Sequence, residues 1–182
     1  MDSDDISLPD RCEKQIEMLN ENPDIDMLGC NCEEFMYNIN NIISHVSLPE
    51  TNEEIKKIAR RRCPYRHPAM FLRKSMVLES GNYRQYYLCE DYDLWIRMIE
   101  KGAIGYNIQE SLVYVRIGED FYKRRGGIKY LKSILKFKKE QLDKGFYSIK
   151  DYIISSGAHI IICLMPNFIR EIFYKNVLRR KK

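Results

Sequence analysis

The sequence lacks a long apolar run. Its longest continuous one covers residues 160–165, and the wider stretch 152–165 is interrupted by Ser155, Ser156 and His159. A helix that crosses a membrane needs about 20 predominantly apolar residues. The sequence therefore predicts no transmembrane helix, and we expect a protein that is soluble or lies on a membrane surface.

Basic residues are lacking at the start, where a secretory signal would carry them, because acidic residues follow Met1 directly. Paired cysteines are lacking too. Of six cysteines only Cys30 and Cys32 lie close together, and no second pair follows at the spacing of a zinc site. We therefore expect a cytoplasmic protein with reduced, mostly buried thiols. Internal repeats and low-complexity segments are also absent.

Charge, by contrast, is plentiful and unevenly divided. The chain of 182 residues has a net charge of +4. Residues 1–120 hold 14 basic and 22 acidic residues, a balance of −8, whereas residues 121–182 hold 16 and 4, a balance of +12. We place a domain boundary near residue 120, between an acidic body and a basic extension. Such asymmetry points to a polyanionic partner: a membrane surface, nucleic acid or a sugar-phosphate lipid.

Apolar periodicity predicts an α/β body followed by a helical extension. The strands that we expect cover residues 25–36, 42–47, 69–73, 104–107 and 112–117. The helices that we expect cover residues 7–21, 51–61, 74–80, 90–101, 121–144, 149–164 and 168–178. Ser7 is the expected N-cap of the first helix, and Thr51 forms a capping box with Glu54 in the second.

Acidic residues form two clusters that carry the functional argument. They are Asp2, Asp4 and Asp5 near the start, and Glu90, Asp91 and Asp93 at the head of a helical run. The second cluster would occupy a first helical turn, where free backbone N–H groups and the helix dipole favour negative charge. Plain capping is one interpretation of each cluster. The other is a single cleft in which a divalent-metal site faces a carboxylate base.

Several blocks of the sequence favour the second interpretation. Residues 1–15, HPAMFLR at 67–73, GNY at 81–83, EDYDLWIR at 90–97 and GEDFYKRRGG at 118–127 follow one another in this order. Together they resemble bacterial family 2 glycosyltransferases of the GT-A fold, notably members that build capsular and extracellular polysaccharide such as amylovoran. The resemblance implies the C-terminal portion of a GT-A fold with a mixed sheet. It also implies that a nucleotide-binding half precedes residue 1 in the complete protein.

Transfer from a nucleotide-sugar requires that the charge of the leaving diphosphate be neutralised and that the acceptor hydroxyl lose a proton. A hard cation, Mg²⁺ or Mn²⁺, held by carboxylate oxygens meets the first need. On alternate residues of a strand end, Asp2 and Asp4 would point the same way. The resemblance implies Asp4 as the direct metal ligand, Asp2 as the nucleotide contact and Asp5 as a candidate for either role.

Asp91 is the predicted general base, because a carboxylate at a helix N-terminus is held ionised and aimed outward. A base opposite the leaving diphosphate implies inversion at the anomeric carbon. Glu90 would orient the acceptor or the base. Asp93 is expected to cap the helix or contact the acceptor, and Trp95 to serve as core or as a sugar platform. His67 is an acceptor contact, a third metal ligand or a structural residue.

Basic residues supply the remaining candidates. Lys123, Arg124 and Arg125 would close over the donor diphosphate or form a solvated helix start. Residues 166–182 predict an amphipathic helix with basic residues around its apolar face. That face consists of Phe168, Ile169, Ile172, Phe173 and Val177. Such a helix suits an anionic membrane surface, or it packs on the body.

We therefore predict an inverting, metal-dependent glycosyltransferase, represented by part of its chain. It would transfer sugar from a nucleotide-sugar to a lipid-linked or saccharide acceptor in bacterial surface polysaccharide synthesis, in the cytoplasm or peripherally at the inner face of the plasma membrane. Nucleic-acid binding is not expected. The alternative is a non-catalytic remnant that binds a membrane or a protein partner through its basic helices.

Overall fold

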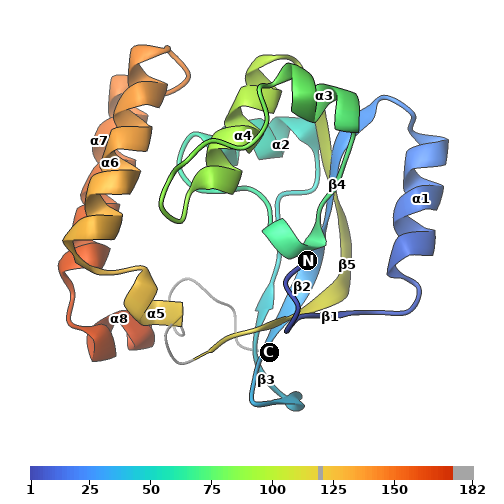
Figure 1. The fold of residues 1–182 in the computed structure, drawn as a ribbon, viewed down its shortest axis with the longest axis horizontal. Helices are drawn as coiled ribbons and strands as arrows, with labels where there is room; N and C mark the ends of the chain where they lie inside the picture. Colours follow the sequence, from blue (N-terminus) through green and yellow to red (C-terminus); the bar gives the residue numbers. More distant parts are fainter. Residues whose placement is uncertain (119–120, 174–182) are drawn as a thin grey trace.

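The computed structural model describes residues 1–118 and 121–173 (Figure 1). Its body is built on a mixed sheet in the order β1-β5-β2-β3, with the short strand β4 also paired to β2. Strands β2 and β5 run parallel, and all other pairs are antiparallel. The strands are β1 (Ile6–Ser7), β2 (Ile25–Met36), β3 (Asn38–Val46), β4 (Phe71–Leu72) and β5 (Ile104–Arg116). The predicted α/β fold with a mixed sheet is confirmed.

Almost all residues of the central strand β2 are buried, as expected for a strand covered on both faces. Successive side chains of β2 therefore pack into two different cores, one on each face of the sheet. Met27 packs with helices α2 (Asn52–Ala59) and α4 (Glu90–Glu100), whereas Leu28 packs on the opposite face. Figure 1 shows α1 (Arg11–Glu21) on that opposite side of the sheet.

Two local expectations are wrong. Ser7 lies in β1 and pairs with Val113, so the first helix starts only at Arg11. The predicted separate strands after residue 103 form one strand, β5, whose register with β2 shifts around Asn31. The capping box of Thr51 and Glu54 is confirmed at the start of α2.

The remaining elements of the body are short. They are the 3-10 turn η1 (His67–Ala69) and the helix α3 (Lys74–Glu79). In the extension the helices are α5 (Phe121–Arg124), α6 (Gly127–Asp143), α7 (Ile149–Leu164) and α8 (Asn167–Phe173). The predicted apolar position Val177 lies outside the described residues.

Helix α6 joins the extension to the body. Ile134 and Phe137 of α6 pack against Tyr92 and Ile96 of α4, and Tyr147 completes this cluster. Helix α7 packs along α6 (Figure 1). Among residues 1–118 and 121–173, no helix has the length and apolar content needed to cross a membrane.

Candidate active site

The first acidic cluster lies in a turn, not at a strand end. The backbone N–H of Asp5 donates to the carbonyl of Asp2 at 3.3 Å, and the strand begins only at Ile6. The expectation that Asp2 and Asp4 stand on alternate positions of a strand is therefore wrong. Both side chains are exposed.

Asp5 is the partly buried member of this cluster. Its Oδ1 accepts the backbone N–H of Arg116 at 2.8 Å, whereas its Oδ2 is buried without a hydrogen-bond partner. Burial raises the pKa of the Asp5 carboxyl, and the nearby charges of Asp2 and Asp4 act in the same direction. The described residues contain no group of three or more His, Cys, Asp or Glu side chains placed to hold a metal ion. The metal thus stays a prediction.

An ion pair with a fully buried carboxylate links β2 to the segment before η1. Glu34 of β2 is fully buried, accepts the Ser44 hydroxyl at 2.6 Å and pairs with Arg66 at 2.5 Å. Strand β5 separates Glu34 from the N-terminal turn, because Val115 pairs with Glu34 and Tyr114 with Ile6. Arg66 directly precedes η1, so this pair anchors the segment that carries His67.

Asp91 lies in the first turn of α4 and is partly buried. Its Oδ1 accepts the backbone N–H of Tyr92 at 2.6 Å. Burial raises the pKa of Asp91, and the negative charge of Glu90 adds to this. The positive charges of His67 and Arg125 act in the opposite direction. The helix terminus alone suggests an ionised, outward carboxylate, whereas the structure gives a carboxylate whose burial favours the protonated form.

The electrostatic effects on Asp91 connect four predicted site residues. Glu90, Asp91, His67 and Arg125 come from α4, η1 and the end of α5, which are distant in sequence. Arg125 also lies over the Phe121 ring, 3.6 Å from the guanidinium carbon to the centroid. Lys123 and Arg124 are exposed on α5.

An aromatic cluster adjoins Asp91. The His67 ring stacks on Trp95 with centroids 6.3 Å apart, and Tyr83 meets His67 edge-on at 6.1 Å. Trp95 is fully buried and packs with Met27 and Leu94, so it belongs to the core and offers no sugar platform. His67 and Tyr83 are the exposed members.

Asp93 neither caps α4 nor faces an acceptor. It is fully buried and pairs with Arg97 at 2.8 Å, one helical turn later. Cys89 occupies the N-cap position, and its side chain makes no capping bond to the described residues. Arg97 also donates to the backbone carbonyls of Ser80 and Asn82. The pair therefore fixes the turn that presents Tyr83.

Comparison with known proteins gives this arrangement a family. No protein-family model matches the chain. The chain is 36% identical over 179 residues to the UDP-Gal:alpha-D-GlcNAc-diphosphoundecaprenol beta-1,3-galactosyltransferase of Escherichia coli. The aligned region covers 98% of this chain and 65% of that protein. It is 31% identical over 180 residues to an uncharacterized glycosyltransferase of Haemophilus influenzae, covering 99% of this chain and 67% of the other.

A third relative is named for polysaccharide biosynthesis. The amylovoran biosynthesis glycosyltransferase AmsE of Erwinia amylovora is 35% identical over 133 residues, 73% of this chain and 49% of that protein. This chain belongs to the bacterial glycosyltransferase family. The predicted family and the predicted enzyme class, a transferase, are confirmed. The chain spans about two thirds of the length of the first two relatives and about half of the third.

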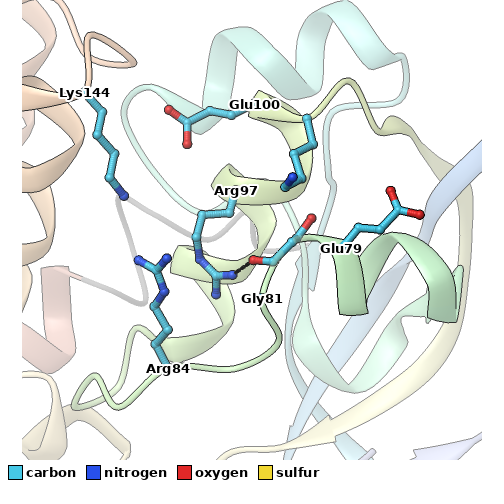
Figure 2. Close-up of a pocket in the computed structure, with 8 residues that line it drawn as sticks. Glu79, Gly81, Arg84, Arg97, Glu100 and Lys144 are labelled. Atoms are coloured by element: carbon cyan, nitrogen blue, oxygen red, sulfur yellow. Dashed lines mark hydrogen bonds between the residues drawn. The ribbon is translucent and has the colours of Figure 1, made fainter.

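The structure also has a cavity of about 380 Å³ at the other end of α4 from Asp91. Figure 2 shows Arg84, Arg97 and Lys144 directed toward this space from three segments. Glu79 and Glu100 line it as well, so it carries charges of both signs. Because neither Asp91 nor the N-terminal acids line it, we do not assign the sugar site to it.

Sequence reasoning missed Tyr83, Glu34 and the pairing of Arg66. Tyr83 lies near Asp91 and Glu90, whose charges together with burial raise the pKa of its hydroxyl. The block GNY contains it, but nothing local marks it as a site residue. The signal for Glu34 was stronger, because it is an acid within an otherwise buried strand, and buried acids are usually paired.

Proposed function

We propose that this glycosyltransferase moves a sugar from a nucleotide-sugar to a lipid-linked saccharide, with Asp91 as the general base. The observation that carries the proposal is the partly buried carboxylate of Asp91 in the first turn of α4, within electrostatic range of Glu90, His67 and Arg125. Such an arrangement suits proton abstraction from a hydroxyl group. We also propose inversion at the anomeric carbon and a fold of the GT-A type.

The burial of Asp91 supports its role as a base. A general base works best when its pKa approaches the pH of the reaction, because it then accepts a proton more readily. Burial raises the pKa of Asp91, while His67 and Arg125 keep the ionised form accessible. Glu90, next to it in the same helical turn, would orient the acceptor.

The acceptor sugar would lie against His67 and Tyr83. Both rings are exposed, and their edge-on contact forms a wall beside Asp91. Aromatic faces bury the apolar faces of ligands while leaving their polar groups free to hydrogen-bond. The Escherichia coli relative is named for an acceptor with a diphosphoundecaprenol group. We extend a lipid-linked acceptor, and with it a position at the cytoplasmic face of the membrane, to this chain.

The donor diphosphate would lie near the N-terminal turn and α5. Mg²⁺ in proteins is commonly held by one or two carboxylates together with substrate phosphates. The buried, unpartnered Oδ2 of Asp5 and the exposed carboxylates of Asp2 and Asp4 fit such a cation. When bound, it would neutralise charge on the leaving diphosphate. Lys123, Arg124 and Arg125 would contact the same phosphates.

The test is transfer from a panel of nucleotide-sugars with Mg²⁺ or Mn²⁺. It uses this chain and a form extended upstream in the reading frame, each as wild type, Asp91→Asn and the control Asp24→Asn. Asp24 is an exposed acid in the turn between α1 and β2. We expect Asp91→Asn to lower the rate by about 100-fold or more, the usual contribution of a general base, and Asp24→Asn to leave it unchanged. Full activity in Asp91→Asn would refute the assignment. A folded, extended chain that is inactive with every donor would favour the non-catalytic alternative.

A further inference from the structure

Helix α7 has an unusual distribution of side chains. Its side toward α6 is polar: Ser155, Ser156 and His159 are buried there to different degrees. Its outward side is apolar, with Ile149 70%, Ile161 60% and Leu164 65% exposed. A helix that packs on a protein in water buries its apolar stripe and exposes its polar side. Helix α7 does the reverse.

Helix α8 continues the apolar side of α7. We call the combined surface the outer face. It consists of Ile149, Ile153, Ile154, Ile160, Ile161, Leu164, Phe168, Ile169 and Ile172. Large exposed apolar surfaces are rare on soluble monomers and mark interaction sites.

The junction of α7 and α8 is held by Arg170. This residue is 3% exposed, and its guanidinium donates to the carbonyls of Ile162, Cys163 and Met165 at the end of α7. It also lies against Gly126, where an added Cβ would come within about 2 Å of the guanidinium. Gly126 follows Arg125 of the candidate active site. The outer face is thus tied to the segment that reaches Asp91.

Charge identifies the occupant. Residues 121–182 carry 16 basic and 4 acidic residues. Five exposed lysines lie on α6 and at the start of α7, namely Lys129, Lys132, Lys136, Lys139 and Lys150. Two copies of this chain that met through the outer face would bring their positive extensions together. An anionic lipid surface instead attracts each basic residue that lies near it.

We propose that the outer face of α7 and α8 is a docking surface for an anionic lipid bilayer. Helix α7 has 16 residues, too few to cross a bilayer, so it lies in the plane of the interface with its isoleucines among the acyl chains. The inward polar groups then resemble those of membrane proteins, where polar side chains face the protein interior. This inference rests on the proposed function only in that the acceptor is carried by a lipid.

The first experiment measures binding of the whole chain to vesicles. Vesicles with about one third phosphatidylglycerol are compared with neutral ones, because a basic surface gains affinity from anionic lipid. The test variant is Ile153→Glu with Ile161→Glu, and the control is Ile16→Glu with Leu78→Glu, which removes exposed apolar residues of the body (51% and 57% exposed). We expect the test variant to lose affinity by about tenfold or more and the control to bind as wild type.

A spectroscopic arm locates the contact. Trp95 is the only tryptophan and is fully buried, so brominated acyl chains should leave wild-type emission unchanged. Phe168→Trp adds a tryptophan on the outer face, and its emission should be quenched on anionic vesicles. Absence of quenching, absence of wild-type binding, or equal binding by the test variant and the control would each overturn the proposal.

Two further measurements separate the docking surface from a dimer contact and from the proposed function. If sedimentation equilibrium without lipid shows a dimer that Ile153→Glu with Ile161→Glu dissociates, and vesicles do not bind, a second copy covers the outer face and the proposal is wrong. Transfer to a water-soluble acceptor analogue separates this inference from the proposed function. Activity without vesicle binding refutes only the docking surface, and vesicle binding without activity refutes only the proposed function.

Discussion

Helix α4 buries its apolar side chains and pairs the charges that it buries, whereas α7 exposes apolar side chains and buries polar ones. In α4, Asp93 and Arg97 form an ion pair beside Trp95 and Ile96. Between α6 and α7, Lys138 is buried with no carboxylate partner among the described residues. Both side-chain polar atoms of Gln141 likewise lack a hydrogen-bond partner within this part of the chain. The two helices face different surroundings. Helix α4 is a core helix of the body, and α7 is suited to a partner of low polarity.

Breaking the ion pair of α4 should have the largest effect. Asp93→Ala leaves the buried guanidinium of Arg97 without its counter-charge and loosens the turn at Ser80 and Asn82. Removal of one member of a buried ion pair typically costs about 3–5 kcal/mol. Chemical denaturation should show this loss in the free energy of unfolding.

The matched control is Asp143→Ala, which removes a pair of the same spacing with Lys139 on the surface of α6. Exposed pairs contribute little to stability, so this variant should unfold almost as wild type does. Equal losses in the two variants would show that the pair in α4 is not specially important.

A second pair of variants compares the two helices directly. Ile96→Ala removes a fully buried side chain between α4 and α6, which should lower the free energy of unfolding by about 2–4 kcal/mol. Ile161→Ala removes a side chain that is 60% exposed, so the change in water should stay within about 0.5 kcal/mol. A large loss from Ile161→Ala would mean that α7 packs differently from the structure described.

A third prediction concerns Lys138, whose ammonium donates to Ser155 and contacts His159. Burial lowers the pKa of Lys138 from 10.5 to about 7, and Cys163 is the other ionisable group that acts on it. Between these values the unfolded chain binds the proton and the folded chain does not. Stability should therefore rise with pH between pH 7 and pH 8, by up to about 1.4 kcal/mol per unit.

Lys138→Met removes this titration and keeps an unbranched apolar chain. The slope of unfolding free energy against pH should flatten in Lys138→Met and persist in the exposed neighbour Lys139→Met. The measurement stops at pH 8 because above it the thiols of the unfolded chain, with an ordinary pKa of 9.0, begin to lose protons. Burial raises the pKa of Cys32 and Cys89 in the folded state, so their titration opposes the trend. An unchanged slope in Lys138→Met would assign the pH dependence to another group.

Much of the body could be predicted from the sequence because local signals decided it. The helix of α4 begins at the predicted acids, and Thr51 caps α2 as its spacing with Glu54 requires. The N-terminal turn could not be predicted, because pairing of Ile6 and Ser7 with β5 determines where β1 begins. That partner is more than 100 residues away in sequence.

Within the candidate site, residue types were predictable but their surroundings were not. The sequence marks Asp91 and His67, whereas only the fold brings Arg125 toward them. Asp93 looks like a capping acid, and the spacing of four to Arg97 becomes decisive only when both are buried. For α7 the sequence predicts the helix but not its orientation. Serine and histidine occupy the inward side, so hydrophobicity alone would choose the wrong face.

The central claim, that Asp91 is the base, is tested most directly by the pH dependence of sugar transfer in wild type and Asp91→Asn. Because burial raises the pKa of Asp91, the wild-type rate should fall on acidification at a pH above the ordinary aspartate value of 3.8. In Asp91→Asn the residual rate should be low and should not show this acidic limb, the fall in rate on acidification. A variant that keeps both the wild-type rate and the acidic limb would contradict the account.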